Sequence, residues 1–70
     1  MAHYIANKNA QSGGEHEVHN ENTCNHLPES RNRQSIGYYT SCKDAIAAAR
    51  KKWTNTFDGC KYCCPECHTK

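Results

Sequence analysis

The sequence predicts a small α+β domain with two to three short antiparallel strands, one helix over about residues 42–53, and a C-terminal cysteine knuckle. Three observations predict this class. Polar and apolar residues alternate with a period of two near the N-terminus, a serine-capped alanine-rich segment lies further on, and four of the six cysteines lie in the last eleven residues. With 70 residues, the chain is expected to form one domain over residues 1–70.

The first two strands are expected on either side of a glycine turn. Residues 3–7 have a strand-like composition. Residues 15–19 alternate, so that His16 and Val18 face one side while the two glutamates and His19 face the other. The Gly-Gly pair between these segments supplies a turn. We therefore expect a β-hairpin.

The middle of the chain contains an irregular segment and then the third expected strand. Residues 20–34 are polar and include a proline, which disfavours regular structure. Residues 35–40 place Ile36 and Tyr38 on one face and are expected to form a strand. Residues 54–59 are expected to be a turn that leads to the cysteine cluster.

The helix is predicted by its start signal and by its apolar face. Ser41 supplies an N-cap, and Asp44 stands three positions later, as in a capping box. Basic residues at 50–52 suit the negative end of the helix dipole. We expect one face of this helix to pack on the sheet. Its members are Cys42, Ile46, Ala49 and Trp53.

A hydrophobic core alone is expected to be too small to stabilise this chain. Leucine, isoleucine, valine and phenylalanine together account for 6 of the 70 residues, a fraction that otherwise indicates disorder. A structural zinc ion contributes about 10–16 kcal/mol of apparent binding free energy. This exceeds the total stability of about 5–15 kcal/mol that is usual for a small domain. A bound metal would therefore decide whether the chain folds.

The six cysteines are compatible with three disulfides or with a metal site and spare thiols. No signal peptide is visible in the sequence. No stretch approaches the length of a membrane-spanning segment. We therefore expect a cytoplasmic protein without membrane contact, in a compartment where metal binding is favoured over disulfides.

The C-terminal cysteines form two adjacent C-x-x-C pairs, Cys60/Cys63 and Cys64/Cys67. A gap of two residues lets both thiolates of a pair face one metal ion, and a closed structural zinc site needs four donors. The pair Cys60/Cys63 directly follows an Asp-Gly turn and is the stronger candidate. The remaining donors come from one of two groups. One is local, Cys64, Cys67 and His68, and the other is upstream, His16, His19, Cys24 and His26.

The upstream group is favoured because of the length of chain that it would restrain. A site built from local residues alone would close a very small loop and leave the weak core unsupported. A site that includes His19 and Cys24 would join the hairpin region to the C-terminus across about forty residues. Cys42, by contrast, lies on the apolar face of the helix and is expected to be a buried apolar side chain rather than a ligand.

The order of these motifs resembles the small Ada-type metal-binding domain. The shared features are a histidine and a cysteine five residues apart, a following strand, a serine-capped alanine-rich helix and a C-x-x-C knuckle, over most of residues 3–63. The resemblance implies a zinc site formed by His19, Cys24, Cys60 and Cys63. The tail after the knuckle departs from the family pattern and makes Cys67 an alternative to His19 as the fourth donor.

The resemblance implies little about activity. In Ada itself, a site cysteine accepts a methyl group from a DNA phosphotriester, but many stand-alone relatives are structural modules, so we do not carry this activity over. The chain also resembles short bacterial proteins. A bacterial, monomeric protein is the corresponding expectation.

The function expected from these observations is that of a non-catalytic, zinc-stabilised binding module. Its partner would be nucleic acid or another protein, since the second half of the chain is basic while residues 1–30 are acidic. The alternative is a thiol-based redox, metal or alkylation sensor with a reactive cysteine near the C-terminus. An enzyme is not expected, because the chain is short for a substrate pocket beside a closed metal site.

Overall fold

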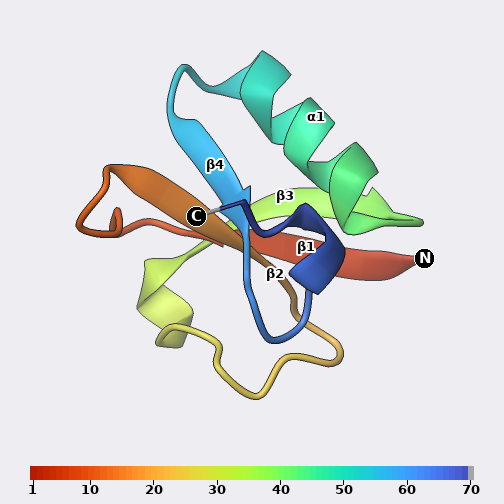
Figure 1. The fold of residues 1–70 in the computed structure, drawn as a ribbon. Coiled ribbons are helices and arrows are strands. Elements are labelled where there is room, and N and C mark those ends of the chain that lie inside the picture. Colours follow the sequence, from red (N-terminus) through yellow and green to blue (C-terminus); the bar gives the residue numbers. More distant parts are fainter. Residues whose placement is uncertain (70) are drawn as a thin grey trace.

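A computed structural model describes residues 1–69 and has one helix packed on a four-stranded sheet (Figure 1). The strands are β1 (Ala2–Asn7), β2 (Glu15–Asn20), β3 (Arg33–Tyr39) and β4 (Thr56–Gly59), and the helix is α1 (Cys42–Lys52). Two short 3-10 helices, η1 (Ser30–Asn32) and η2 (Pro65–Cys67), complete the described elements. The predicted α+β class and its single helix are confirmed.

The strand order is β3-β1-β2-β4, so that β1 lies between β3 and β2. The predicted hairpin is present, with Ile5 opposite His19 in antiparallel register. Its turn contains Gly14 at a φ of +91°, a conformation that glycine adopts without steric cost. The third predicted strand pairs antiparallel with the other edge of β1.

The fourth strand corrects the sequence prediction of a turn over residues 54–59 and of an all-antiparallel sheet. β4 pairs in parallel with β2, with Glu15 opposite Thr56 and Val18 opposite Gly59. The strand is four residues long and carries one large apolar side chain, Phe57. A local pattern this short does not reveal a strand whose pairing partner lies about forty residues earlier in the chain.

The helix starts at its predicted cap. Ser41 Oγ accepts a hydrogen bond from the Asp44 backbone N–H at 3.3 Å, which satisfies one of the exposed donors of the first turn. The Asp44 carboxylate accepts a hydrogen bond from the Thr40 hydroxyl at 3.1 Å. The last helical residue is Lys52, and Trp53 forms the C-cap with its N–H donating to Ala49 O at 2.9 Å.

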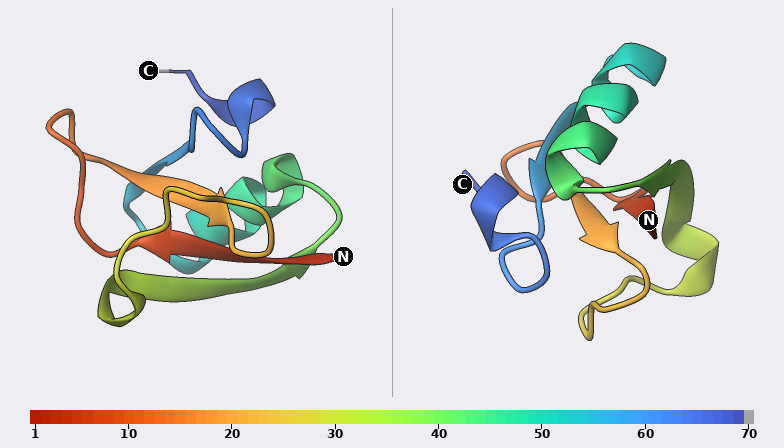
Figure 2. Two further views of the ribbon diagram at one scale, coloured as in Figure 1. Left: turned by 90° about the horizontal axis from the view of Figure 1, so that it is seen from below. Right: turned by 90° about the vertical axis from the view of Figure 1, so that its right-hand side faces the viewer.

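The two faces of the sheet are covered differently (Figure 2). α1 lies on one face, where Ala45, Ile46 and Ala49 are buried against the strands. The segment between β2 and β3 runs along the opposite side, where Ile5 and His19 are each about 1% exposed. Among residues 1–69, no helix has the length and apolar character that a membrane span requires.

Candidate metal centre

Four of the predicted donors come together on the side of the sheet opposite α1. Their ligand atoms all lie within 4.8 Å of one another, and three of the four residues are buried. His19 is on β2, Cys24 is in the turn after β2, and the other two donors follow β4. The four residues are His19, Cys24, Cys60 and Cys63.

Backbone pairing brings the two halves of this group together. β4 ends beside the end of β2, and the Cys60 N–H extends the pairing by donating to Val18 O at 2.9 Å. The knuckle then turns back, with the Cys64 N–H donating to Cys60 O at 2.8 Å. On the β2 side, the Cys24 N–H donates to Asn20 O at 3.0 Å and closes a second turn. Two turns at the ends of neighbouring parallel strands therefore present the donors to one point.

Gly59 is required where the knuckle begins. A Cβ atom at this position would lie 2.6 Å from the Cβ of Cys67 and 2.8 Å from its carbonyl carbon. These atoms belong to η2 and its backbone, which cannot move aside as a flexible side chain can. The close approach of the C-terminal segment to β4 therefore depends on the missing side chain.

Two separations between donor atoms are close to those of a tetrahedral zinc site. Two sulfur atoms bound to one zinc ion at about 2.3 Å lie about 3.8 Å apart. The Sγ atoms of Cys24 and Cys60 are 3.8 Å apart. His19 Nδ1 lies 3.4 Å from Cys24 Sγ, close to the separation of a nitrogen and a sulfur on the same ion. The group is thus compatible with a metal ion at its centre.

Backbone amides also point at the sulfur atoms. The Asn20 N–H donates to Cys63 Sγ at 3.4 Å, and the His26 N–H donates to Cys24 Sγ at 3.4 Å. Such donors stabilise sulfur in its anionic form, which is the form that binds metal.

Burial favours the neutral forms of the same side chains. It raises the pKa of both Cys24 and Cys63 to about 12. It lowers the pKa of His19 below its ordinary value. A neutral imidazole is ready to bind a metal, whereas the thiols need a cation at the centre before they lose their protons near neutral pH.

The far nitrogen of the His19 ring faces a carboxylate. His19 Nε2 is buried without a hydrogen bond among the described residues, and Glu17 Oε1 lies 3.6 Å away. Metal-bound histidines usually direct their second N–H at a carboxylate or a carbonyl. If Nδ1 binds the metal, Nε2 carries the proton and Glu17 is placed to attract it. Glu17 and His19 share a face of β2, as the alternation of residues 15–19 predicts.

The structure places Cys67 outside this group. Cys67 forms a disulfide with Cys42 that joins η2 to the start of α1. The two sulfur atoms of this disulfide and a carboxylate oxygen of Glu66 form a second group of closely spaced donor atoms. Because the two sulfur atoms are bonded to each other, they are not thiolates that could bind a metal. The sequence reasoning missed this disulfide, because the place of Cys42 on the apolar helix face indicated a buried apolar side chain. The even number of cysteines was the available signal.

The other candidate donors have different partners. Cys64 is buried, and its Sγ lies 3.6 Å from Cys63 Sγ. His68 Nδ1 lies 3.0 Å from Gly59 O, and His16 Nδ1 lies 2.8 Å from Asn7 O. His26 stacks on the Tyr62 ring with their centroids 3.9 Å apart. In the part of the chain that the structure describes, none of these four side chains belongs to the group formed by His19, Cys24, Cys60 and Cys63.

Comparisons with protein-family models, with curated proteins and with solved structures found no match to this chain.

Proposed function

We propose that this protein is a non-catalytic binding module stabilised by one Zn²⁺ ion bound to His19, Cys24, Cys60 and Cys63. The observation that supports it is the convergence of three thiols and one imidazole, from both ends of the chain, within 4.8 Å. A set of three sulfurs and one nitrogen is typical of structural zinc sites. These are also the four residues that the resemblance to Ada-type domains implies.

The proposed ion has a structural role because of where its donors lie in the chain. His19 lies near the end of β2 and Cys24 follows that strand, whereas the other two donors follow β4. The ion would therefore hold the parallel strand pair together at its carboxyl ends. A binding free energy of about 10–16 kcal/mol at such a position is comparable to the whole stability of a domain of this size.

The donor set also argues against catalysis at this site. A catalytic zinc ion has three protein ligands and keeps one position open for water or substrate. Here four protein donors converge, and three of them are buried. The carboxylate of Glu17 lies 3.6 Å from Nε2, the far nitrogen of the His19 ring, rather than among the four donors. A closed site of this kind stabilises a fold and leaves no position for a substrate.

The metal proposal is tested by native mass spectrometry and by substitution with Co²⁺. We expect one zinc ion per chain and, in the Co²⁺ protein, thiolate-to-cobalt charge-transfer bands together with the intense d–d bands of a tetrahedral site. Cys60→Ser should abolish stoichiometric binding. Cys64→Ser, its matched control, changes a buried cysteine of the same knuckle and should retain the ion. A protein that binds no metal, or equal losses in the two variants, would refute the proposal.

The proposed partner is nucleic acid or protein. Two of the basic side chains that could contact nucleic acid already have hydrogen-bond partners within the chain. Arg33 donates to Glu21 Oε2 at 3.2 Å and to Pro28 O at 2.8 Å. Lys52 donates to Ile36 O at 3.0 Å. These contacts occupy part of the basic surface that the sequence suggests for nucleic acid. Retention on a single-stranded DNA column that weakens with salt would support a nucleic-acid partner. Its absence at low ionic strength would favour a protein.

A thiol-based sensor is the second candidate, and it is favoured by the disulfide Cys42–Cys67 beside four further cysteine thiols. Burial works against it in the metal-free chain, because it raises the pKa of Cys63 and of Cys64 and so reduces the reactive thiolate. Alkylation with iodoacetamide, mapped by mass spectrometry, tests the candidate. One thiol that reacts much faster than the others in the zinc-loaded protein would support a sensor. Uniformly slow thiols would eliminate it.

A further inference from the structure

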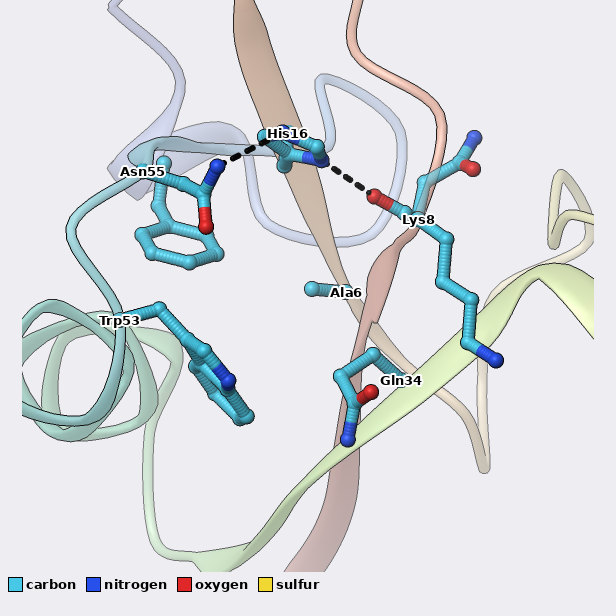
Figure 3. Close-up of a pocket in the computed structure, with 8 residues that line it drawn as sticks. Ala6, Lys8, His16, Gln34, Trp53 and Asn55 are labelled. Carbon is cyan, nitrogen blue, oxygen red and sulfur yellow. Dashed lines mark hydrogen bonds between the residues drawn. The ribbon is translucent and has the colours of Figure 1, made fainter.

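A second site lies at the other end of the sheet from the metal centre, on the face that carries α1. It is a cavity of about 250 Å³ between the start of β2, the end of β1 and the C-cap of the helix. Figure 3 shows its side chains around an open centre, with the methyl group of Ala6 at the base. The lining residues are Ala6, Asn7, Lys8, His16, Gln34, Trp53, Asn55 and Phe57.

The cavity lies where a small side chain on β1, Ala6, is surrounded by larger ones. Ala6 is buried on the central strand, and its register partner on β3 is Gln34, whose side chain reaches over the edge of the hollow (Figure 3). Trp53 and Phe57 form an aromatic wall on the other side, with ring centroids 6.2 Å apart and planes tilted by 52°. A space of this volume accepts one planar ring system and is smaller than the usual pocket for a drug-sized ligand, about 300–1,000 Å³.

Hydrogen bonds determine which polar atoms the cavity offers. His16 Nδ1 lies 2.8 Å from Asn7 O, and a carbonyl can only accept, so Nδ1 carries the proton. In the neutral ring Nε2 is then an acceptor, and Asn55 donates to it through Nδ2 at 3.4 Å. The amide of Asn55 is thereby oriented, and its carbonyl oxygen remains as an acceptor.

Gln34 is oriented in the same way. Its Nε2 donates to Ser35 O at 3.3 Å, which leaves the side-chain oxygen as an acceptor. In Figure 3 the amide nitrogen of Gln34 points away from the open centre of the cavity. The rim therefore presents two amide oxygens, and these match a flat ligand that carries N–H donors.

The charge at the rim selects an anion. None of the eight lining residues is acidic, and Lys8 contributes an ammonium group. A second cation, Lys52, has its Nζ 5.9 Å from the centroid of the Trp53 ring. A ligand with an aromatic ring, N–H donors and a negative charge has the chemistry of a nucleotide whose base carries an exocyclic amino group.

We propose that this cavity binds an amino-bearing nucleobase of a nucleotide. The base stacks against Trp53, its amino group donates to the side-chain oxygen of Gln34, and its phosphate is attracted to Lys8. This deepens the binding half of the proposed function but uses none of the metal donors. A zinc-loaded protein that binds no nucleotide would refute this inference and leave the metal proposal intact.

The test uses the fluorescence of Trp53, which is the single tryptophan of the chain. Zinc-loaded protein is titrated with AMP, CMP and UMP. We expect AMP and CMP to quench the emission, with UMP about tenfold weaker because uracil has a carbonyl in place of the amino group and leaves the Gln34 oxygen unpaired. No quenching by AMP or CMP up to about 10 mM, or equal binding of UMP, would overturn the proposal.

Variants of exposed residues separate the cavity from the rest of the surface. Gln34→Leu should weaken AMP binding about tenfold, whereas Gln11→Leu, an exposed glutamine in the hairpin turn, should leave it unchanged. Lys8→Ala should abolish the preference for AMP over adenosine, and Lys43→Ala on the exposed side of α1 should not. Equal effects within either pair would contradict the assigned site.

A short single-stranded oligoadenylate identifies the source of the base. Binding of both AMP and the oligomer, each weakened by Gln34→Leu, indicates a site for bases of a strand. Binding of AMP alone indicates a free nucleotide. A third outcome would refute the cavity assignment. If the oligomer binds, AMP does not, and Gln34→Leu leaves oligomer binding unchanged, then nucleic acid binds elsewhere on the protein.

Discussion

The backbone N–H of Cys60 donates to the carbonyl of Val18 at 2.9 Å, and this bond places the C-terminal knuckle beside His19. The bond continues the parallel pairing of β4 with β2 by one residue. It also joins segments that lie about forty residues apart in the chain. The candidate metal centre is therefore a consequence of the sheet topology as much as of the cysteine spacing.

Removal of the metal should unfold the protein or leave it without cooperative structure. The apolar core is small, and the donors hold the carboxyl ends of β2 and β4 together. Treatment with a strong zinc chelator, followed by circular dichroism during heating, should show loss of the cooperative transition. Addition of Zn²⁺ should restore it. An unchanged transition in a protein shown to be metal-free would contradict the structural role.

The disulfide Cys42–Cys67 should stabilise the fold without affecting metal content. It closes a loop with a sequence separation of 25 residues, and the loss of such a cross-link costs about 2–4 kcal/mol. Urea unfolding of zinc-loaded Cys67→Ser should show this decrease in the free energy of unfolding. The same variant should still bind one zinc ion per chain. Loss of the ion from Cys67→Ser would instead indicate that Cys67 is a ligand.

Metal affinity should rise with pH. Each thiol must lose its proton on binding, and burial raises the pKa of Cys24 and Cys63 to about 12, so affinity should increase about tenfold per pH unit for each thiol that releases a proton. Isothermal titration of Zn²⁺ between pH 6 and 8, in buffers of different ionisation enthalpy, measures the released protons. An affinity that does not change with pH would contradict thiol ligation.

Glu17→Gln should weaken metal binding without unfolding the protein. Glu17 Oε1 lies 3.6 Å from the buried Nε2 of His19 and can orient that ring towards the other donors. Loss of such a partner typically costs about 10–100-fold in metal affinity. Glu29→Gln is the control, since Glu29 is exposed and pairs with Arg31 at 3.5 Å. Competition with a chromophoric chelator gives both affinities, and equal values would exclude the positioning role.

Gly59→Ala should destabilise the junction between β4 and η2. The new Cβ would lie 2.6 Å from the Cβ of Cys67, so the C-terminal segment would have to move. Overpacking of this kind costs about 1–3 kcal/mol. Chemical unfolding of the zinc-loaded variant measures the loss, and a stability within about 0.5 kcal/mol of the parent would show that the segment shifts freely.

The local elements of the fold could be predicted because their signals are local. Ser41 and Asp44 mark the start of α1 within one turn, and the alternation of residues 15–19 identifies β2 together with its two faces. The C-x-x-C pairs and the histidines and cysteine near them in the sequence or in the hairpin region give nine candidate metal donors. These features depend on neighbouring residues alone, so a single sequence contains the information.

Tertiary structure alone decided the long-range contacts. β4 becomes a strand because β2 offers it a parallel edge, and four residues with one large apolar side chain carry too weak a pattern to show this. The bond between Cys42 and Cys67 depends on where the chain turns after the knuckle, which spacing does not reveal. The sequence by itself therefore determined the helix, the hairpin and the set of possible donors. The packing of distant segments decided which of those donors meet, because that choice depends on contacts between residues far apart in the chain.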